Sequence, residues 1–183
     1  MSNPTLPSDC ACCAAGPDAV EASLREMIAN TGFAMIGVMA ESKEKPTFVY
    51  TVGMASKGLP ELCMIGVQMM TAQSIIGAMA KHFIDGKLNL ANLGHKQDAY
   101  ANVPMLPKRV YPHTEDQLNH FAWVPKFVDD PEDLENIVFV QVVVPDRYGH
   151  FPGDEGYYIP SQTLLPTEPL NIPAQAAGEP RVH

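Results

Sequence analysis

Long hydrophobic runs are missing from this sequence of 183 residues. A membrane-spanning helix needs about 20 consecutive apolar residues, and no run in the chain approaches that length. The opening residues, MSNPTLPSDC, also lack the basic and apolar regions of a secretion signal. We therefore expect a cytoplasmic protein with no membrane partner.

Basic residues are scarce as well. The chain has 12 lysines and arginines against 21 aspartates and glutamates, which gives a formal net charge of -9. Such a charge repels phosphate backbones, and no expected helix carries a stripe of lysine or arginine. We therefore expect no nucleic-acid partner, whereas a protein partner with a basic face, such as a toxin bound by its immunity protein, would suit the charge.

The signatures of several enzyme classes are also absent. The sequence contains no GxGxxG, no GxxxxGK[ST], no HExxH and no GxSxG. Dinucleotide-binding proteins, P-loop nucleotide hydrolases, zinc proteases of the HExxH type and hydrolases with a nucleophile elbow therefore lose their usual support. No reaction follows from the motifs alone.

The apolar sequence that is present suffices for one core. Hydrophobic residues make up 46% of the chain and charged residues 18%, and the length favours a single domain. We expect a cysteine-containing flexible arm over residues 1–16, one domain over residues 17–158, and a proline-rich tail, extended or disordered, over residues 159–183.

Hydrophobic periodicity predicts an α+β fold. Apolar residues recur at helical spacing over residues 17–31 and 71–84, and Thr114 with Gln117 forms a capping-box pattern before a short third helix. Pro104 and Pro107 indicate an edge or irregular strand. Short polar connections favour antiparallel neighbours, so we expect a mainly antiparallel sheet with two to three helices packed on it. The other strands are expected to begin at Phe33, Thr47, Glu61 and Asn136.

Three cysteines cluster near the N-terminus, at Cys10, Cys12 and Cys13. Closely spaced thiolates can hold zinc or another thiophilic metal, or exchange disulfides. A structural zinc site normally takes four ligands, and a second cysteine pair is missing from the sequence. The cluster is thus either a metal or thiol sensor or a set of incidental thiols, whereas Cys63 is expected to be a small buried hydrophobe.

A buried strand leads directly into the turn VVVPDRYGHFPGDEGY, which gathers Asp146, His150 and Asp154 at one end of the sheet. An aspartate and a histidine four residues apart across a turn can share a proton or bind a metal together. In the simpler interpretation, Asp146 hydrogen-bonds the backbone of its own turn, and Gly149 supplies a positive φ. Both interpretations stay open at this point.

Several segments together resemble the bacterial domain of unknown function 4262. They are YTVGM, GLPEL, the glycine of IGV, and the late QVVVPDxxGHFP, and the likeness extends over about Cys10 to Tyr157. The resemblance implies a fold shared by small bacterial, phage and plasmid proteins, and it implies no established activity. It points to Tyr50, Thr51, Gly53, Pro60, Glu61, Gln141, Asp146, Gly149, His150 and Pro152.

Polar residues in an otherwise apolar hairpin need partners, because an unpaired buried polar group costs several kcal/mol. If the strands that begin at Thr47 and Asn136 are neighbours, Tyr50, Thr51 and Gln141 would form one hydrogen-bonded network, with Glu61 and the Asp146 turn at its rim. Such a set is either a structural lock or a binding pocket.

The leading hypothesis is a binding or interaction module that recognises a small molecule or a protein through a polar-lined pocket. An alternative is an enzyme with His150 as the general acid or base, Asp146 orienting it, and Glu61 as a second carboxylate. The third is the metal or thiol sensor. The candidate ligand-binding residues are Tyr50, Thr51, Glu61, Gln141, Asp146 and His150.

Overall fold

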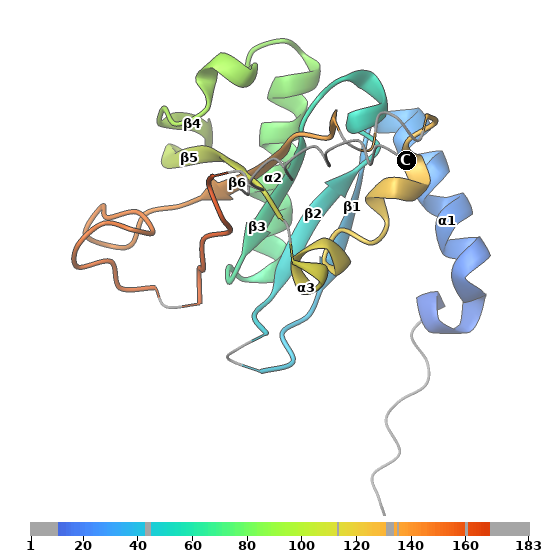
Figure 1. Cartoon of the computed structure of the whole chain (residues 1–183), viewed down its shortest axis with the longest axis horizontal. Coiled ribbons are helices and arrows are strands. Elements are labelled where there is room, and N and C mark those ends of the chain that lie inside the picture. The colour runs from blue at the N-terminus through green and yellow to red at the C-terminus, as the bar shows by residue number, and fades with distance from the viewer. Residues whose placement is uncertain are drawn as a thin grey trace, which may run out of the picture.

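A six-stranded sheet organises the part of the chain that the computed structural model describes, namely residues 11–42, 45–112, 114–130, 134, 136–159 and 161–168. All neighbouring strands are antiparallel except β3 and β6, which are parallel. The predicted α+β fold is confirmed (Figure 1). The order across the sheet is β1 (Ala34–Val38), β2 (Phe48–Val52), β3 (Glu61–Ile65), β6 (Phe139–Val143), β5 (Val103–Val110) and β4 (Gln97–Tyr100).

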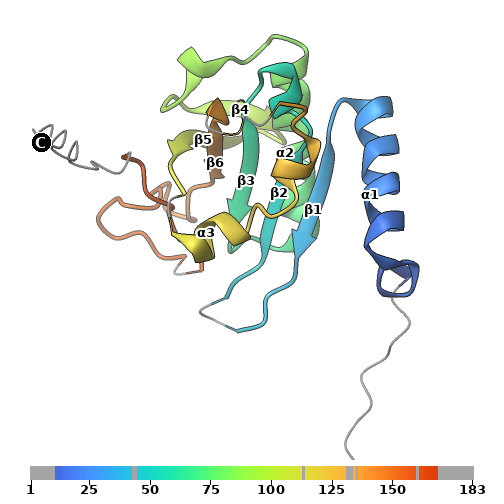
Figure 2. The ribbon, with the colours of Figure 1, turned by 45° about the vertical axis from the view of Figure 1, so that its right-hand side comes forward.

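The two faces of the sheet are covered by different helices (Figure 2). Helix α2 (Met69–Ile84) packs on one face, and helix α1 (Ala11–Thr31) with the segment α3 (Glu115–Asn119) to η3 (Val124–Phe127) packs on the other. Side chains alternate between the faces of a strand. Val49 accordingly joins the α2 cluster, whereas Phe48 and Tyr50 join the cluster that contains Leu24 of α1.

The helix signals in the sequence act as expected. Gly16, with φ 76° and ψ 164°, interrupts α1, so the regular helix starts at Pro17, and Gly32 follows its end with φ 93°. Thr114 and Gln117 form the predicted capping box of α3. Within the described ranges, no helix is both long enough and apolar enough to span a membrane.

Of the two alternatives predicted from Pro104 and Pro107, the edge strand is wrong, because β5 lies between β6 and β4, whereas the irregular strand is present as a register shift in the pairing of β5 with β4. Proline is excluded from a central strand only where its missing N–H leaves a ladder bond unmade. The residues of β5 that pair with β6 run from Leu106 to Val110, so Pro104 lies outside that ladder. The carbonyl of Pro107 accepts a bond from Gly94, which lies before β4 begins at Gln97.

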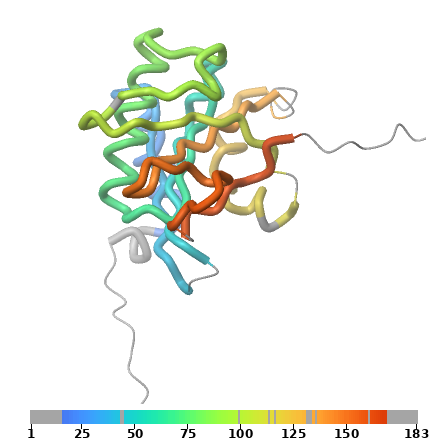
Figure 3. Tube along the Cα trace, turned by 90° about the vertical axis from the view of Figure 1, so that its left-hand side faces the viewer, coloured from blue at the N-terminus to red at the C-terminus, as the bar shows by residue number. Residues whose placement is uncertain are grey.

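Residues 161–166, here called the strap, return to the sheet after the last strand (Figure 3). The backbone N–H of Tyr111, next to the end of β5, donates to the carbonyl of Pro166 at 2.8 Å. Leu165 packs against the core cluster on the α1 face. Val110 pairs with Phe139, the first residue of β6, so the strap runs back along β6 from its last residues toward its start.

Candidate functional site

Glu61 and Thr51 form a closed set of hydrogen bonds, and both side chains are completely buried. One carboxylate oxygen of Glu61 accepts the N–H groups of Met54 and Ala55, at 2.8 and 2.9 Å, and the other accepts the Thr51 hydroxyl at 2.6 Å. Thr51 Oγ1 in turn accepts the N–H of Leu62 at 2.8 Å. These bonds lock the connection between β2 and β3.

Two opposing effects act on the pKa of the Glu61 carboxyl. Burial raises the pKa of the carboxyl above its ordinary value, and hydrogen bonds from Thr51 and from the backbone of Ala55, Met54 and Gly53 lower that pKa in part. Glu61 is completely buried, and three donors of the β2–β3 connection occupy both of its oxygens, so it acts as a structural lock.

Tyr50 belongs to an aromatic cluster on the α1 face. Its ring contacts Phe48 at 5.4 Å and Phe121 at 5.5 Å between ring centroids, and only 2% of the residue is exposed. Burial raises the pKa of its hydroxyl to about 12, although a hydrogen bond with the backbone of Trp123 lowers it. Tyr50 is therefore a core residue.

Gln141 recognises the strap through its amide. Its Nε2 donates to the carbonyl of Thr163 at 2.6 Å, and its Oε1 accepts the N–H of Leu165 at 2.8 Å. The strap also passes so close to Gly66 that a Cβ there would lie 1.7 Å from the carbonyl oxygen of Ser161. The amide of Gln141 therefore joins β6 to the strap, a later segment of the same chain.

The predicted network of Tyr50, Thr51 and Gln141 does not form, because β3 lies between β2 and β6. Tyr50 pairs with Cys63, and Cys63 pairs with Gln141, so the three residues lie in one row across three strands. Burial raises the pKa of the Cys63 thiol, as suits a small buried hydrophobe. Thr51 joins Glu61 instead.

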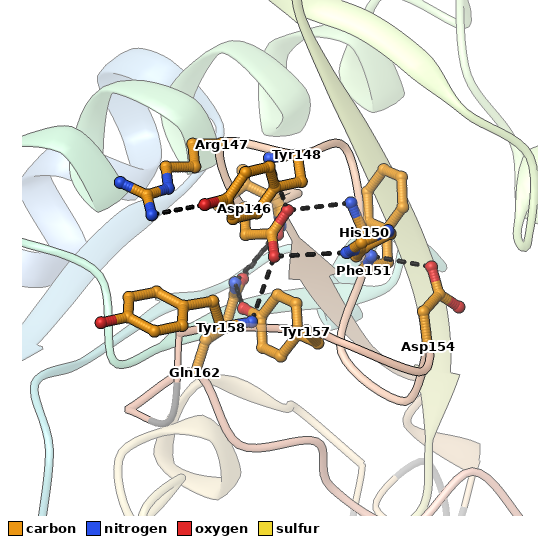
Figure 4. Close-up of polar contacts among 10 residues, drawn as sticks. Asp146, Arg147, Tyr148, His150, Phe151, Asp154, Tyr157, Tyr158 and Gln162 are labelled. Carbon is orange, nitrogen blue, oxygen red and sulfur yellow. Dashed lines mark hydrogen bonds and ion pairs between the residues drawn. The ribbon is translucent and has the colours of Figure 1, made fainter.

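The late turn, residues 146–158, is the second place where candidate residues meet, and Figure 4 shows its polar contacts. Asp146 Oδ1 accepts the N–H groups of Tyr148 and His150, at 2.8 and 3.0 Å, and Oδ2 accepts the N–H of Tyr158 at 3.1 Å. Gly149 has φ 88°. Asp146 therefore bonds the backbone of its own turn, and Gly149 supplies the positive φ, as the simpler interpretation predicted. The bond to Tyr158 closes a loop of thirteen residues.

His150 lies beside the Asp146 carboxylate with its Nδ1 3.6 Å from Oδ2. That nitrogen is buried and has no hydrogen-bond partner within the described residues, whereas 43% of the side chain as a whole is exposed. Burial raises the pKa of Asp146. The backbone N–H donors of His150, Tyr148 and Tyr158, together with the nearby imidazole, lower that pKa by more than burial raises it, so the pKa lies below its ordinary value. The carboxylate is held ionised next to an accessible imidazole.

Asp154 stands apart from this pair. Its Oδ2 accepts the N–H of Phe151 at 2.8 Å, so it caps a second, shorter turn. Gln162 of the strap bonds close to both ends of the late turn. Its amide donates to the carbonyl of Val144 and accepts the N–H of Val144, at 2.9 Å each, and it also bonds to the hydroxyl of Tyr157. The strap and the late turn therefore form one unit.

Sequence reasoning missed the side chains that the late turn presents to solvent. Tyr148 is 61% exposed and Tyr158 is 68% exposed. The guanidinium of Arg147 lies over both rings, 4.6 Å from the centroid of Tyr148 and 5.5 Å from that of Tyr158, and it bonds to the Tyr148 hydroxyl. The available signal was two tyrosines in a stretch that has no strand or helix period.

A cleft beside α3 involves none of the predicted site residues. It has a volume of about 620 Å³ and is open to solvent. Apolar and polar residues both line it, namely Val38, Met39, Glu41, Lys45, Pro46, Phe48, Asn119 and His120.

The thiol cluster is not tested by the geometry. Cys10, and the side chains of Cys12 and Cys13, lie outside the described residues, so zinc or another thiophilic metal there stays a prediction. Within the residues that are described, no group of three or more histidine, cysteine, aspartate or glutamate side chains is arranged to hold a metal ion.

Comparison with known proteins supplies a family and no activity. No curated protein and no solved structure matches the chain. One family matches residues 27–158, a range that contains the Thr51–Glu61 lock and the late turn and ends before the strap. The chain therefore belongs to the family described as Domain of unknown function (DUF4262).

Proposed function

We propose that this protein is a cytoplasmic binding module whose contact surface is the late turn. The observation that carries the proposal is the exposed group of Arg147, Tyr148 and Tyr158, in which one guanidinium lies over two aromatic rings. Tyrosine and arginine are enriched in protein–protein contact sites, where they supply most of the binding free energy. The surface is thus of the kind that binds another protein.

Rigidity supports the same proposal. Three backbone N–H groups bound to Asp146 fix the loop, and Gln162 fixes its base. A contact surface that is ordered before binding loses less conformational entropy when the partner docks. The predicted polar-lined pocket gives way to this surface, since Tyr50, Thr51, Glu61 and Gln141 are each less than 3% exposed.

Affinity capture tests the proposal. The tagged chain, the double variant Tyr148→Ala/Tyr158→Ala and the control Tyr100→Ala would each be incubated with extract of the source cells. Tyr100 is a suitable control because it is 40% exposed and lies in β4. A protein retained by the chain and the control but lost from the double variant would support the proposal; equal retention by all three would contradict it.

Acid–base catalysis is the second candidate, because His150 Nδ1 faces an ionised Asp146 at 3.6 Å. A carboxylate in that position can orient an imidazole for proton transfer. Glu61, the other carboxylate named as a catalytic candidate, is completely buried and takes no part. The rate at which His150 is carbethoxylated, measured by mass spectrometry, tests the pairing with Asp146. The variant Asp146→Asn should slow this reaction, and the exposed His95 serves as the internal reference. An unchanged rate would contradict the pairing.

A metal or thiol sensor built on the N-terminal cysteines is a third proposal, and it is independent of the late turn. Thiolates are the ligands that thiophilic metals prefer. Native mass spectrometry of the chain and of a variant with serine at positions 10, 12 and 13 would decide the matter. Loss of bound zinc in the variant would support the sensor, and equal metal content would remove it.

A further inference from the structure

We propose that the partner that docks on the late turn presents an aspartate or glutamate carboxylate to Arg147; this assignment rests on the proposed function. Arg147 is the cation at the centre of the surface, and the rings of Tyr148 and Tyr158 lie against its guanidinium. The guanidinium donates one N–H to the Tyr148 hydroxyl, and its remaining N–H groups are left as donors for a partner. An edge-on guanidinium matches a carboxylate, which accepts two parallel hydrogen bonds.

Arg147 forms no ion pair with the carboxylate of Asp146, the residue that precedes it in the chain. Both oxygens of Asp146 are taken up by backbone N–H groups. Among the ion pairs of the described residues, Asp146 pairs with His150, and none includes Arg147. Tyr148 supplies a hydroxyl to Arg147, which is a neutral partner. The guanidinium of Arg147 therefore has donors that no carboxylate of the described residues occupies, and an incoming carboxylate could accept them.

Asp154, another acidic residue of the turn, lies away from the charge of Arg147. Figure 4 shows Arg147 and Asp154 on opposite sides of Asp146, and Asp154 is engaged with the N–H of Phe151. Tyr158 extends to the same side as Arg147. The turn thus presents a local cation flanked by aromatic surface.

The charge of the whole chain selects among anions. A net charge of -9 opposes the approach of a polyanion such as nucleic acid, whose charges repel the protein over a Debye length of about 10 Å. A single carboxylate on a neutral or basic protein meets Arg147 without that penalty. The expected partner is therefore a protein whose contact face carries an isolated aspartate or glutamate beside apolar residues that cover the two rings.

Titration with simple anions, followed by nuclear magnetic resonance of the arginine Nε–H groups, tests this assignment on the full chain. The probes are sodium acetate, sodium phosphate and sodium chloride at equal ionic strength. Arg109 is the matched control, because its guanidinium also lies over a tyrosine ring, 5.2 Å from the centroid of Tyr111. We expect acetate to shift the Nε–H signal of Arg147 more than that of Arg109, because two rings hold the Arg147 guanidinium in place and one ring contacts that of Arg109.

A second variant separates geometry from charge. Arg147→Lys keeps the charge and loses the planar fork, so acetate should no longer shift the ring signals of Tyr148 and Tyr158. Equal shifts at Arg147 and Arg109, or a response to phosphate and not to acetate, would overturn the carboxylate assignment. Neither result would touch the proposed function, which fails only if captured protein is retained after Tyr148 and Tyr158 are replaced.

Discussion

At the scale of single residues, polar side chains inside this fold replace backbone pairing where the chain leaves the sheet. Backbone pairing between β2 and β3 extends from Phe48 to Tyr50 on β2. Beyond Tyr50, the side chains of Thr51 and Glu61 supply the hydrogen bonds. A valine or leucine at either position would leave the N–H groups of Met54 and Ala55 or of Leu62 without acceptors. An unmade bond of this kind costs about 1–3 kcal/mol.

Glu61→Ala should therefore destabilise the protein strongly. Three donors lose their acceptor at once, so we expect a loss of about 3–5 kcal/mol in the free energy of unfolding. Urea denaturation would measure the loss. Glu61→Gln is the control, because its carbonyl can still accept from Met54 and Ala55; an equal loss in both variants would show that the negative charge, rather than the acceptor, carries the effect.

The charge of Glu61 also predicts a pH dependence. Burial raises the pKa of this carboxyl above its ordinary value of 4.5, so the folded state keeps the proton to a higher pH than the unfolded state does. Its stabilising contribution is then complete below the unfolded pKa and is lost as pH rises through the folded pKa. The free energy of unfolding should fall less with rising pH in Glu61→Gln than in the parent chain, and identical pH profiles would contradict this.

At the scale of elements, the strap and the late turn depend on each other. Gln141 binds the strap backbone, and Gln162 binds the backbone of Val144 just before the late turn. Side-chain amides suit this role because each offers a donor and an acceptor, as a strand residue does. Displacing the strap should therefore loosen the surface that carries Arg147.

Gly66→Ala should displace the strap. The added Cβ would lie 1.7 Å from Ser161 O, and φ at this position is 71°. Gly58→Ala is a matched control, because φ is 69° there and no atom lies within 4 Å of the added Cβ. The positive φ alone costs about 1–2 kcal/mol in both variants. We expect a larger loss of stability and faster hydrogen exchange at residues 161–166 in Gly66→Ala; equal behaviour would contradict the close packing.

The sequence predicts the elements better than their contacts. Local patterns sufficed for α1, for the α3 capping box and for the φ of Gly149, because each depends on residues within a few positions. The placement of β6 between β3 and β5 depends on pairings between distant strands, and periodicity carries no information about which strands are neighbours. For that reason the network of Tyr50 with Gln141 failed as a prediction.

The candidate site divides in the same way. The bonds of Asp146 to its own turn follow from the four-residue spacing to His150, whereas the stacking of Arg147 on Tyr158 needs the loop to fold back over eleven positions. The role of Gln162 depends on the strap returning to β6, and no local pattern indicates that return.

At the scale of the whole molecule, an acidic chain carries the exposed group of Arg147, Tyr148 and Tyr158 on its late turn. The net charge of -9 favours partners that are neutral or basic overall, and Arg147 between two tyrosines offers them an anchor. The late turn follows β6 and is held by Asp146 and Gln162, so the proposed contact lies outside the sheet and its helical layers. Binding and stability should therefore respond to different substitutions.

The affinity of the double variant Tyr148→Ala/Tyr158→Ala for the captured partner, measured by calorimetry beside its thermal unfolding midpoint, tests this account most directly. Two hot-spot residues contribute about 2 kcal/mol each, so we expect affinity to fall by about a hundredfold or more while the midpoint stays close to that of the parent chain. Tyr100→Ala should bind as the parent does. Undiminished affinity in a folded double variant would contradict the claim that the late turn is the contact surface.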